Sequence, residues 1–254
     1  MKLVRDTWLI FQRQFNLLIR QPVWVFVGVF QPVMYLLLFA PLLKPALASL
    51  GATSDADTYR IFVPGLLVLL AIFGGLMQGF GLIAELRAGV IERSRVTPIS
   101  RLALLLGRSL RDVVSLIAQA VIITLLALIF DLRIFIGYLL LAYLMLALIS
   151  LMTSALSYGV ALAVKSEDAL APLMNTVAQP VLLLSGILLP LTFAPGWLQG
   201  IADWNPFSWA VDGTRALFRG DLGSPDVWQG LIIMAVLAAA AVGWAAREFA
   251  RSVR

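Results

Sequence analysis

The residues best suited to chemistry or binding lie in one charged segment, residues 84–112, which is interpreted as a loop between two apolar runs. Within 85–95 the charges alternate in sign, a pattern typical of a helix that meets water or a polar partner. Thr97 and Pro98 are expected to end that helix, because the residue before a proline resists the α conformation. Two interpretations stay open for this segment: a surface that contacts a polar partner, or a basic anchor that only fixes the membrane topology.

The residue types of this chain do not indicate a catalytic site. The chain has no histidine and no cysteine, which removes the commonest general base and the thiolate metal ligands. No group of nucleophile, base and orienting residue is apparent, and no Gly-rich loop ends in Lys-Ser or Lys-Thr to hold a nucleotide. We therefore expect no catalytic residue, no metal and no cofactor in this chain.

The composition predicts a membrane protein. The mean hydropathy is +0.95, and 13% of the residues are charged, against about 25% in a soluble domain. The apolar residues form runs long enough to cross a bilayer. These runs predict an all-α fold with six transmembrane helices at about 23–43, 61–83, 113–130, 134–164, 169–191 and 227–246. Prolines and glycines interrupt the fifth run, which is expected to kink or to end early.

The segment before the first run predicts an amphipathic helix at the membrane surface, over residues 1–22. An apolar face is expected to enter the lipid, and polar residues cover the rest of this helix. The apolar face consists of Val4, Trp8, Phe11, Phe15 and Leu18, and the polar residues are Arg5, Gln12, Arg13, Asn16 and Arg20. Residues 23–254 would then form a single transmembrane domain.

The distribution of basic residues predicts the orientation. Of the 19 Lys and Arg residues, 14 belong to the side that holds both termini and residues 84–112, and 5 to the other side. Because basic residues stay in the cytoplasm, both termini are expected there. The N-terminal residues do not resemble a cleaved signal peptide.

Few ionisable residues lie in the predicted spans, which argues against an ion-coupled carrier. Their interior polar and soft residues are candidates for lining a path for an amphipathic molecule. The alternative is that the amides only bond neighbouring helices. These candidates are Gln31, Met34, Tyr35, Phe73, Met77, Gln78, Asn175 and Gln179. Gly75 and Gly79 permit a close helix approach, within the chain or across a dimer.

Two short helices are predicted at the outer boundary between the last two spans. Asn205 followed by Pro206 is typical of a helix start. In the helix that follows, Asp212 and Arg215 stand at a pairing distance on the face opposite the apolar one. Tryptophans 197, 204 and 209 suit the headgroup level.

These segments together resemble the ABC-2 type permeases, the membrane subunits of bacterial ABC exporters, and within them the daunorubicin-resistance branch. Three stretches carry the resemblance: the run from Glu85 to Asp112, the segment Leu184–Leu191 with Pro195 and Trp197, and Asn205-Pro206 with Asp212 and Arg215. The match covers nearly the whole chain.

The resemblance implies a homodimer in the bacterial plasma membrane, joined by two separate ATPase subunits that hold ATP and Mg²⁺. It implies that residues 85–101 and the N-terminal helix contact the ATPase, and that spans one, two and five border the path. The expected coupling residues are Glu85, Arg87, Glu92, Arg93, Arg95 and Arg101. No nucleic acid is expected as a partner.

Three functions stay open. The first is export of a hydrophobic or amphipathic compound, such as a drug or a lipid. The second is export of a polysaccharide or glycolipid. The third is a membrane anchor or assembly factor without transport.

Overall fold

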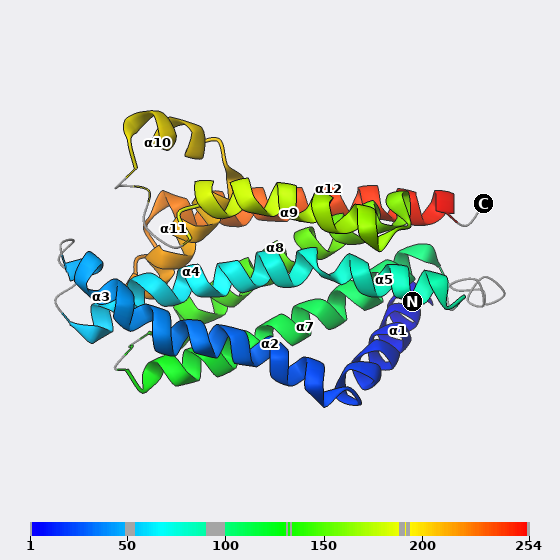
Figure 1. The fold of residues 1–254 in the computed structure, drawn as a ribbon, viewed down its shortest axis with the longest axis horizontal. Helices are drawn as coiled ribbons and strands as arrows, with labels where there is room; N and C mark the ends of the chain where they lie inside the picture. The colour runs from blue at the N-terminus through cyan, green and yellow to red at the C-terminus, as the bar shows by residue number, and fades with distance from the viewer. Residues whose placement is uncertain are drawn as a thin grey trace.

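The computed structural model is a bundle of helices that run along one long axis (Figure 1). It describes residues 2–48, 54–89, 100–130, 132, 134–187, 191 and 194–252. The helices are α1 (Lys2–Ile19), α2 (Pro22–Met34), the π-helical turn η1 (Tyr35–Phe39), α3 (Ala40–Ala48), α4 (Asp55–Leu76), α5 (Gln78–Arg87), α7 (Arg101–Leu128), α8 (Ile136–Val164), α9 (Glu167–Leu184), α10 (Gly196–Ala202), α11 (Pro206–Arg219) and α12 (Pro225–Ser252). Both chain ends lie at the same end of the bundle, beside α1 and α5 (Figure 1).

Five described segments are long and apolar enough to cross a membrane: Phe26–Pro45, Ala56–Arg87, Arg101–Leu128, Ile136–Val164 and Pro225–Arg251. Helix α9 has 18 residues, but it opens with Glu167 and Asp168 and contains two prolines. It ends at Leu184, so the prediction that the fifth run ends early is confirmed. The predicted class, an all-α polytopic membrane protein, is confirmed for the described residues.

Helix α8 lies at the centre of the bundle and contacts α4, α5, α7, α11 and α12. Its buried side carries small hydroxyl residues that reach the backbone of α4. Thr153 Oγ1 donates to the carbonyl oxygen of Ala71 at 3.1 Å. This approach requires Gly75, because a Cβ there would lie 1.9 Å from Thr153 Oγ1. The close approach allowed by Gly75 and Gly79 is therefore made within the chain, against α8.

Two neighbouring glycines give a matched test of this packing. A methyl group at Gly75 would collide with Thr153, whereas one at Gly74 would meet nothing within 4 Å. We expect Gly75→Ala to lower the free energy of unfolding by about 1–3 kcal/mol, the usual cost of overpacking a core. Gly74→Ala should leave it nearly unchanged. Thermal unfolding in detergent micelles measures both, and equal effects would contradict the packing described here.

Helix α1 packs against the first half of α7. Val4 and Trp8 are exposed as the apolar face requires, but Phe11 is buried, and the buried side also holds Asp6 and Gln14. The helix thus turns polar groups inward and part of its apolar face outward. The predicted polar residues are exposed as well, and such a mixed outer side suits a helix at the lipid boundary.

Residues 101–112 are not a loop. They form the first turns of α7, which continues without a break into the third apolar run. Ser100 caps this helix, because its side chain accepts a hydrogen bond from the backbone N–H of Ala103 at 3.1 Å. The interpretation of residues 84–112 as one loop was therefore wrong for its second part. In the first part of the segment, α5 ends at Arg87, and Gly89 just beyond it has a φ of 67°. Residues 90–99, where the rest of the predicted helix and its end at Thr97 and Pro98 fall, lie outside the described residues.

At the opposite end, α10 and α11 are the two predicted short helices. Asn205 caps α11 through a hydrogen bond from the backbone N–H of Phe207 at 3.1 Å, with Pro206 at the first helical position. The predicted pair of Asp212 and Arg215 is present at 3.4 Å. However, Arg215 is buried and not on an outer face.

Candidate functional site

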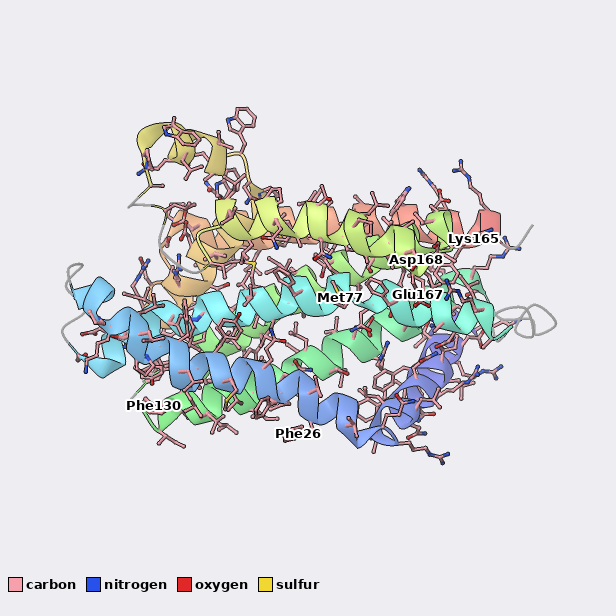
Figure 2. The ribbon with its side chains drawn as sticks, in the orientation of Figure 1. Phe26, Met77, Phe130, Lys165, Glu167 and Asp168 are labelled. Atoms are coloured by element: carbon pink, nitrogen blue, oxygen red, sulfur yellow. The ribbon has the colours of Figure 1, made fainter. Side chains whose placement is uncertain are left out.

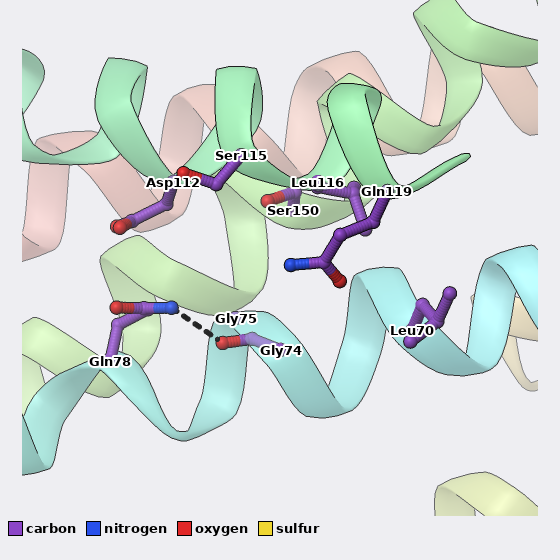
Figure 3. A pocket seen from close by; sticks show the side chains of 9 residues that line it. All are labelled: Leu70, Gly74, Gly75, Gln78, Asp112, Ser115, Leu116, Gln119 and Ser150. Atoms are coloured by element: carbon purple, nitrogen blue, oxygen red, sulfur yellow. Dashed lines mark hydrogen bonds between the residues drawn. The ribbon is translucent and has the colours of Figure 1, made fainter. Parts of the chain in front are cut away.

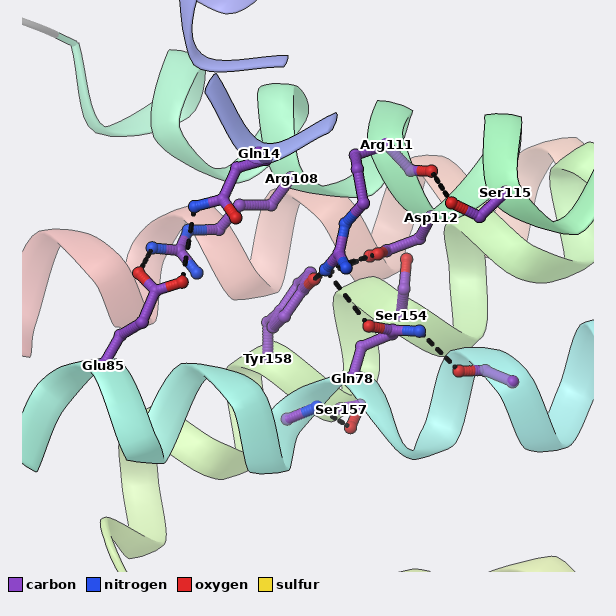
Figure 4. Close-up of polar contacts among 12 residues, drawn as sticks. Gln14, Gln78, Glu85, Arg108, Arg111, Asp112, Ser115, Ser154, Ser157 and Tyr158 are labelled. Carbon is purple, nitrogen blue, oxygen red and sulfur yellow. Dashed lines mark hydrogen bonds and ion pairs between the residues drawn. The ribbon is translucent and has the colours of Figure 1, made fainter. Parts of the chain in front are cut away.

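A group of charged and polar side chains lies where α5, α7 and α8 meet (Figure 4). Its first part, which we name the Glu85 pair, joins three helices. Arg108 of α7 makes an ion pair and a hydrogen bond with Glu85 of α5. Gln14 of α1 donates to the second oxygen of Glu85 at 3.3 Å. Arg108 is 5% exposed, so this contact lies inside the protein.

The second part, which we name the Asp112 cluster, lies further along α7 and consists of Gln78, Arg111, Asp112 and Tyr158. Tyr158 of α8 donates its hydroxyl hydrogen to Asp112 at 2.6 Å. Arg111 contacts the other oxygen of Asp112 at 2.8 Å and donates to Gln78 at 3.2 Å. Asp112 lies about 16 Å along the helix axis from the start of α7.

The charges of the two parts balance. Arg108 and Arg111 face Glu85 and Asp112, and each carboxylate has one of the arginines as its partner. A single charge at this depth would be costly, whereas paired and hydrogen-bonded charges are tolerated. Arg108, Arg111 and Asp112 precede the predicted third span at 113–130, so the expectation of few ionisable residues in the predicted spans stays a prediction, but α7 carries these three in its first turns. Ionisable groups in a membrane span are functional candidates by default.

A small cavity adjoins the Asp112 cluster (Figure 3). It has a volume of about 40 Å³. A water molecule needs about 10–15 Å³ of such space, and a drug-sized ligand about 300 Å³ or more. It is lined by Leu70, Gly74, Gly75, Gln78, Asp112, Ser115, Leu116, Gln119 and Ser150. The cavity suits a few water molecules and is too small for a drug.

Three of the predicted coupling residues are described, and each makes a contact between helices. Glu85 belongs to the pair with Arg108. Arg87 pairs with Glu167 at the start of α9 at 3.2 Å. Arg101 donates to the carbonyl oxygen of Ala250 near the end of α12 at 2.7 Å. Three others, Glu92, Arg93 and Arg95, lie outside the described residues.

The predicted path residues fall into separate groups. Phe73, Met77 and Gln78 lie on the α4–α5 stretch, and of these Gln78 belongs to the Asp112 cluster. Asn175 and Gln179 lie exposed on α9, where Asn175 donates to the carbonyl oxygen of Ala171 in its own helix at 3.0 Å. The remaining three belong to the first span: Gln31 is exposed, and Met34 and Tyr35 are half-buried.

At the other end of the bundle, another buried arginine joins α11 to the turn that follows α9. Arg215 of α11 donates to the carbonyl oxygens of Gly186 and Ile187 at 2.7 and 3.2 Å, just past the end of α9. Gly186 has a φ of 66°, which favours glycine, so α9 stops there. Gly65 of α4 makes room for this turn, since a Cβ would lie 2.2 Å from the Ile187 oxygen. Partial burial raises the pKa of the Asp212 carboxyl above its ordinary value, and the nearby Arg215 opposes that shift.

Sequence reasoning missed Arg108, Arg111 and Asp112 as site residues. The available signal was the stretch from Ser100 to Asp112, which begins with a cap and contains no proline, and so favours a helix that continues into the third run. The roles of Tyr158 and Glu167 could not be predicted from the sequence, because their partners are distant in the chain. Among the described residues, no group of three or more acidic side chains could hold a metal ion.

The fold and the site define a polytopic helical membrane protein with a buried, charge-balanced group of side chains among α5, α7 and α8. The family model of the ABC-2 type transporter matches residues 5–218, and the chain belongs to that family. It is the membrane permease of an ABC transporter, a class that works with a partner ABC ATPase subunit.

The chain is similar to two kinds of curated relatives. It is 30% identical to the daunorubicin resistance ABC transporter permease protein DrrB1 of Streptomyces coeruleorubidus, over 86% of this chain and 76% of that protein. It is 26% identical to the putative transport permease ycf38 of Cyanophora paradoxa, over 92% of this chain and 85% of that protein. The expected family is thereby confirmed.

Proposed function

We propose that this permease exports a hydrophobic or amphipathic compound, a drug or a lipid, out of the cytoplasm, powered by two copies of a separate ATPase. The observation that carries this proposal is the 30% identity, over most of the chain, to a permease named for daunorubicin resistance. ATP and Mg²⁺ would bind to the ATPase subunits. A polysaccharide or glycolipid exporter and a non-transporting anchor are the alternatives that the experiment below separates.

The arrangement of the helix ends supports a cytoplasmic coupling face. Helix α1, the end of α5 and the start of α7 gather at the end of the bundle where both termini lie (Figure 1). The predicted coupling residues Glu85, Arg87 and Arg101 are at this end. Together with the excess of Lys and Arg on this side, this supports cytoplasmic termini in a bacterial plasma membrane.

The exposed side of α9 supports a path shared by two copies of the chain. Asn175, Thr176 and Gln179 are exposed there, although amide groups that face lipid are unfavourable. A second permease copy or a polar pathway would cover them. We therefore propose a homodimer in which this side of α9 borders the path, with Gln31, Met34, Tyr35, Phe73, Met77 and Gln78 as further lining residues.

Replacing Asn175 and Gln179 together with leucine is expected to lower ATP-driven export of daunorubicin about eightfold to thirtyfold, since each of the two amide contacts contributes roughly 0.6–1 kcal/mol. Val177→Leu, at an exposed apolar position of the same helix, is the control and should leave export unchanged. Uptake into inverted vesicles that contain the permease and its copurified ATPase measures the effect.

The same vesicles separate the alternatives. Uptake of a fluorescent glycolipid without uptake of daunorubicin would favour the glycolipid exporter. A stable permease that binds no ATPase would contradict the proposal and favour a membrane anchor.

A further inference from the structure

The second membrane span is broken in its middle. Helix α4 ends at Leu76 and α5 begins at Gln78, with Met77 between them. Met77 lies midway along the bundle (Figure 2). At this point the backbone pattern changes, because the N–H of Phe80 bonds to the carbonyl oxygen of Met77 at 3.3 Å, three residues back and not four. No proline causes the break.

A side chain of the neighbouring helix occupies the gap. The hydroxyl group of Ser157 in α8 donates to the carbonyl oxygen of Leu76 at 2.5 Å and accepts from the N–H of Gly79 at 2.9 Å. These are the two backbone groups that the break leaves without helical partners. Sharp kinks occur where a side chain inserts into the helical hydrogen bonds in this way. Gly79 permits the insertion, since a Cβ would lie 2.6 Å from the Ser157 oxygen.

The far end of α5 is tied to three other helices. Glu85 contacts Gln14 of α1 and Arg108 of α7. Arg87 pairs with Glu167 at the first residue of α9, where α9 begins beside Lys165 and Asp168 (Figure 2). Helix α5 is thus a ten-residue rod, with a break at one end and ionic contacts at the other.

We propose that α5 acts as a lever that pivots at Met77 and passes movement of the coupling face to α9 through the Arg87–Glu167 pair. Hinges are a few residues at element ends that absorb the backbone change. The Ser157 hydroxyl both donates and accepts, and its hydrogen turns to follow an acceptor, so it keeps both backbone groups bonded over small changes in the angle between α4 and α5. The lever rests on the proposed function, because ATPase closure supplies the movement.

Spin labels on either side of the break test the pivot. The chain contains no cysteine, so single cysteines can be labelled directly. Gly74 before the break, Gly81 after it and Gly243 in α12 each have open space around a new Cβ. The pairs Gly74→Cys with Gly243→Cys and Gly81→Cys with Gly243→Cys are measured by pulsed electron paramagnetic resonance in the ATPase complex, diluted with unlabelled chain to suppress distances between protomers.

With MgATP and vanadate, the Gly81–Gly243 distance is expected to change by more than about 2 Å, beyond an ordinary helix shift. The Gly74–Gly243 distance should stay constant. Equal changes in both pairs, or no change in a complex that hydrolyses ATP, would overturn the lever. Failure of the unlabelled complex to hydrolyse ATP would overturn the proposed function instead, and the lever with it.

Charge reversal tests the contact with α9. A third label pair, Leu173→Cys in α9 with Gly243→Cys, reports the movement of α9, and its distance should also shift with MgATP and vanadate. Arg87→Glu and Glu167→Arg should each reduce the population at the shifted distance about twofold to fivefold. The double reversal should restore it. The pair of Arg251 and Glu248, at a similar 3.1 Å in α12, is the matched control and should show no effect. Single reversals without effect, or a double reversal without rescue, would contradict the transfer through this pair.

Discussion

Replacing Arg215 with methionine is expected to lower the free energy of unfolding by about 3 kcal/mol or more. The side chain donates to the carbonyl oxygens of Gly186 and Ile187, and each buried acceptor left without a donor costs about 1–3 kcal/mol. Methionine keeps the apolar stem and offers no donor. The loss should therefore fall on the turn that ends α9 and on its contact with Gly65.

Two further variants identify the cause. Arg215→Lys keeps the charge but loses the planar group that reaches both carbonyls, so an intermediate loss is expected. Arg219→Met, at an exposed position one turn later, should change stability by less than about 0.5 kcal/mol. Thermal unfolding in detergent measures all three, and an Arg215→Met variant as stable as Arg219→Met would contradict the role of Arg215.

The sequence predicted the helical membrane fold because its signals are local. Long apolar runs, the Asn205-Pro206 start and the early end of the fifth run each depend on neighbouring residues. The described structure has the start, the early end and five helical segments that are apolar enough to cross a membrane. The faces of α1 and α11 were harder to predict. Phe11 and Arg215 are buried because of what packs over them, which periodicity does not reveal.

The candidate site could be predicted only in part, because several of its contacts join residues that are distant in the chain. Arg108 pairs with a residue 23 positions away, and Asp112 bonds to one 46 positions away. Without those partners, the arginines at the start of α7 resemble a charged loop. Glu85 and Arg87 were expected as coupling residues from the family resemblance, and their partners Gln14 and Glu167 emerged only in the structure.

The second large loss in the free energy of unfolding is expected at the Glu85 pair. Arg108→Met leaves Glu85 facing only the amide of Gln14, and Glu85→Met leaves the buried Arg108 without its carboxylate. Each single change is expected to lower the free energy of unfolding by about 3–5 kcal/mol, as when one partner of a buried ion pair is removed. The pair of Glu248 and Arg251, whose arginine is exposed, should lose less than about 1 kcal/mol when treated in the same way.

The double variant Glu85→Met with Arg108→Met distinguishes stability from function. Two apolar side chains of similar size replace a buried ion pair at little cost, so the fold should recover to within about 1 kcal/mol of the natural protein. If the pair transmits movement from the coupling face, this stable variant should still bind the ATPase but show ATP-driven export reduced at least tenfold. Normal export by a stable double variant would mean that Glu85 and Arg108 serve the fold alone. The lever in α5 would then act through Arg87 and Glu167 only.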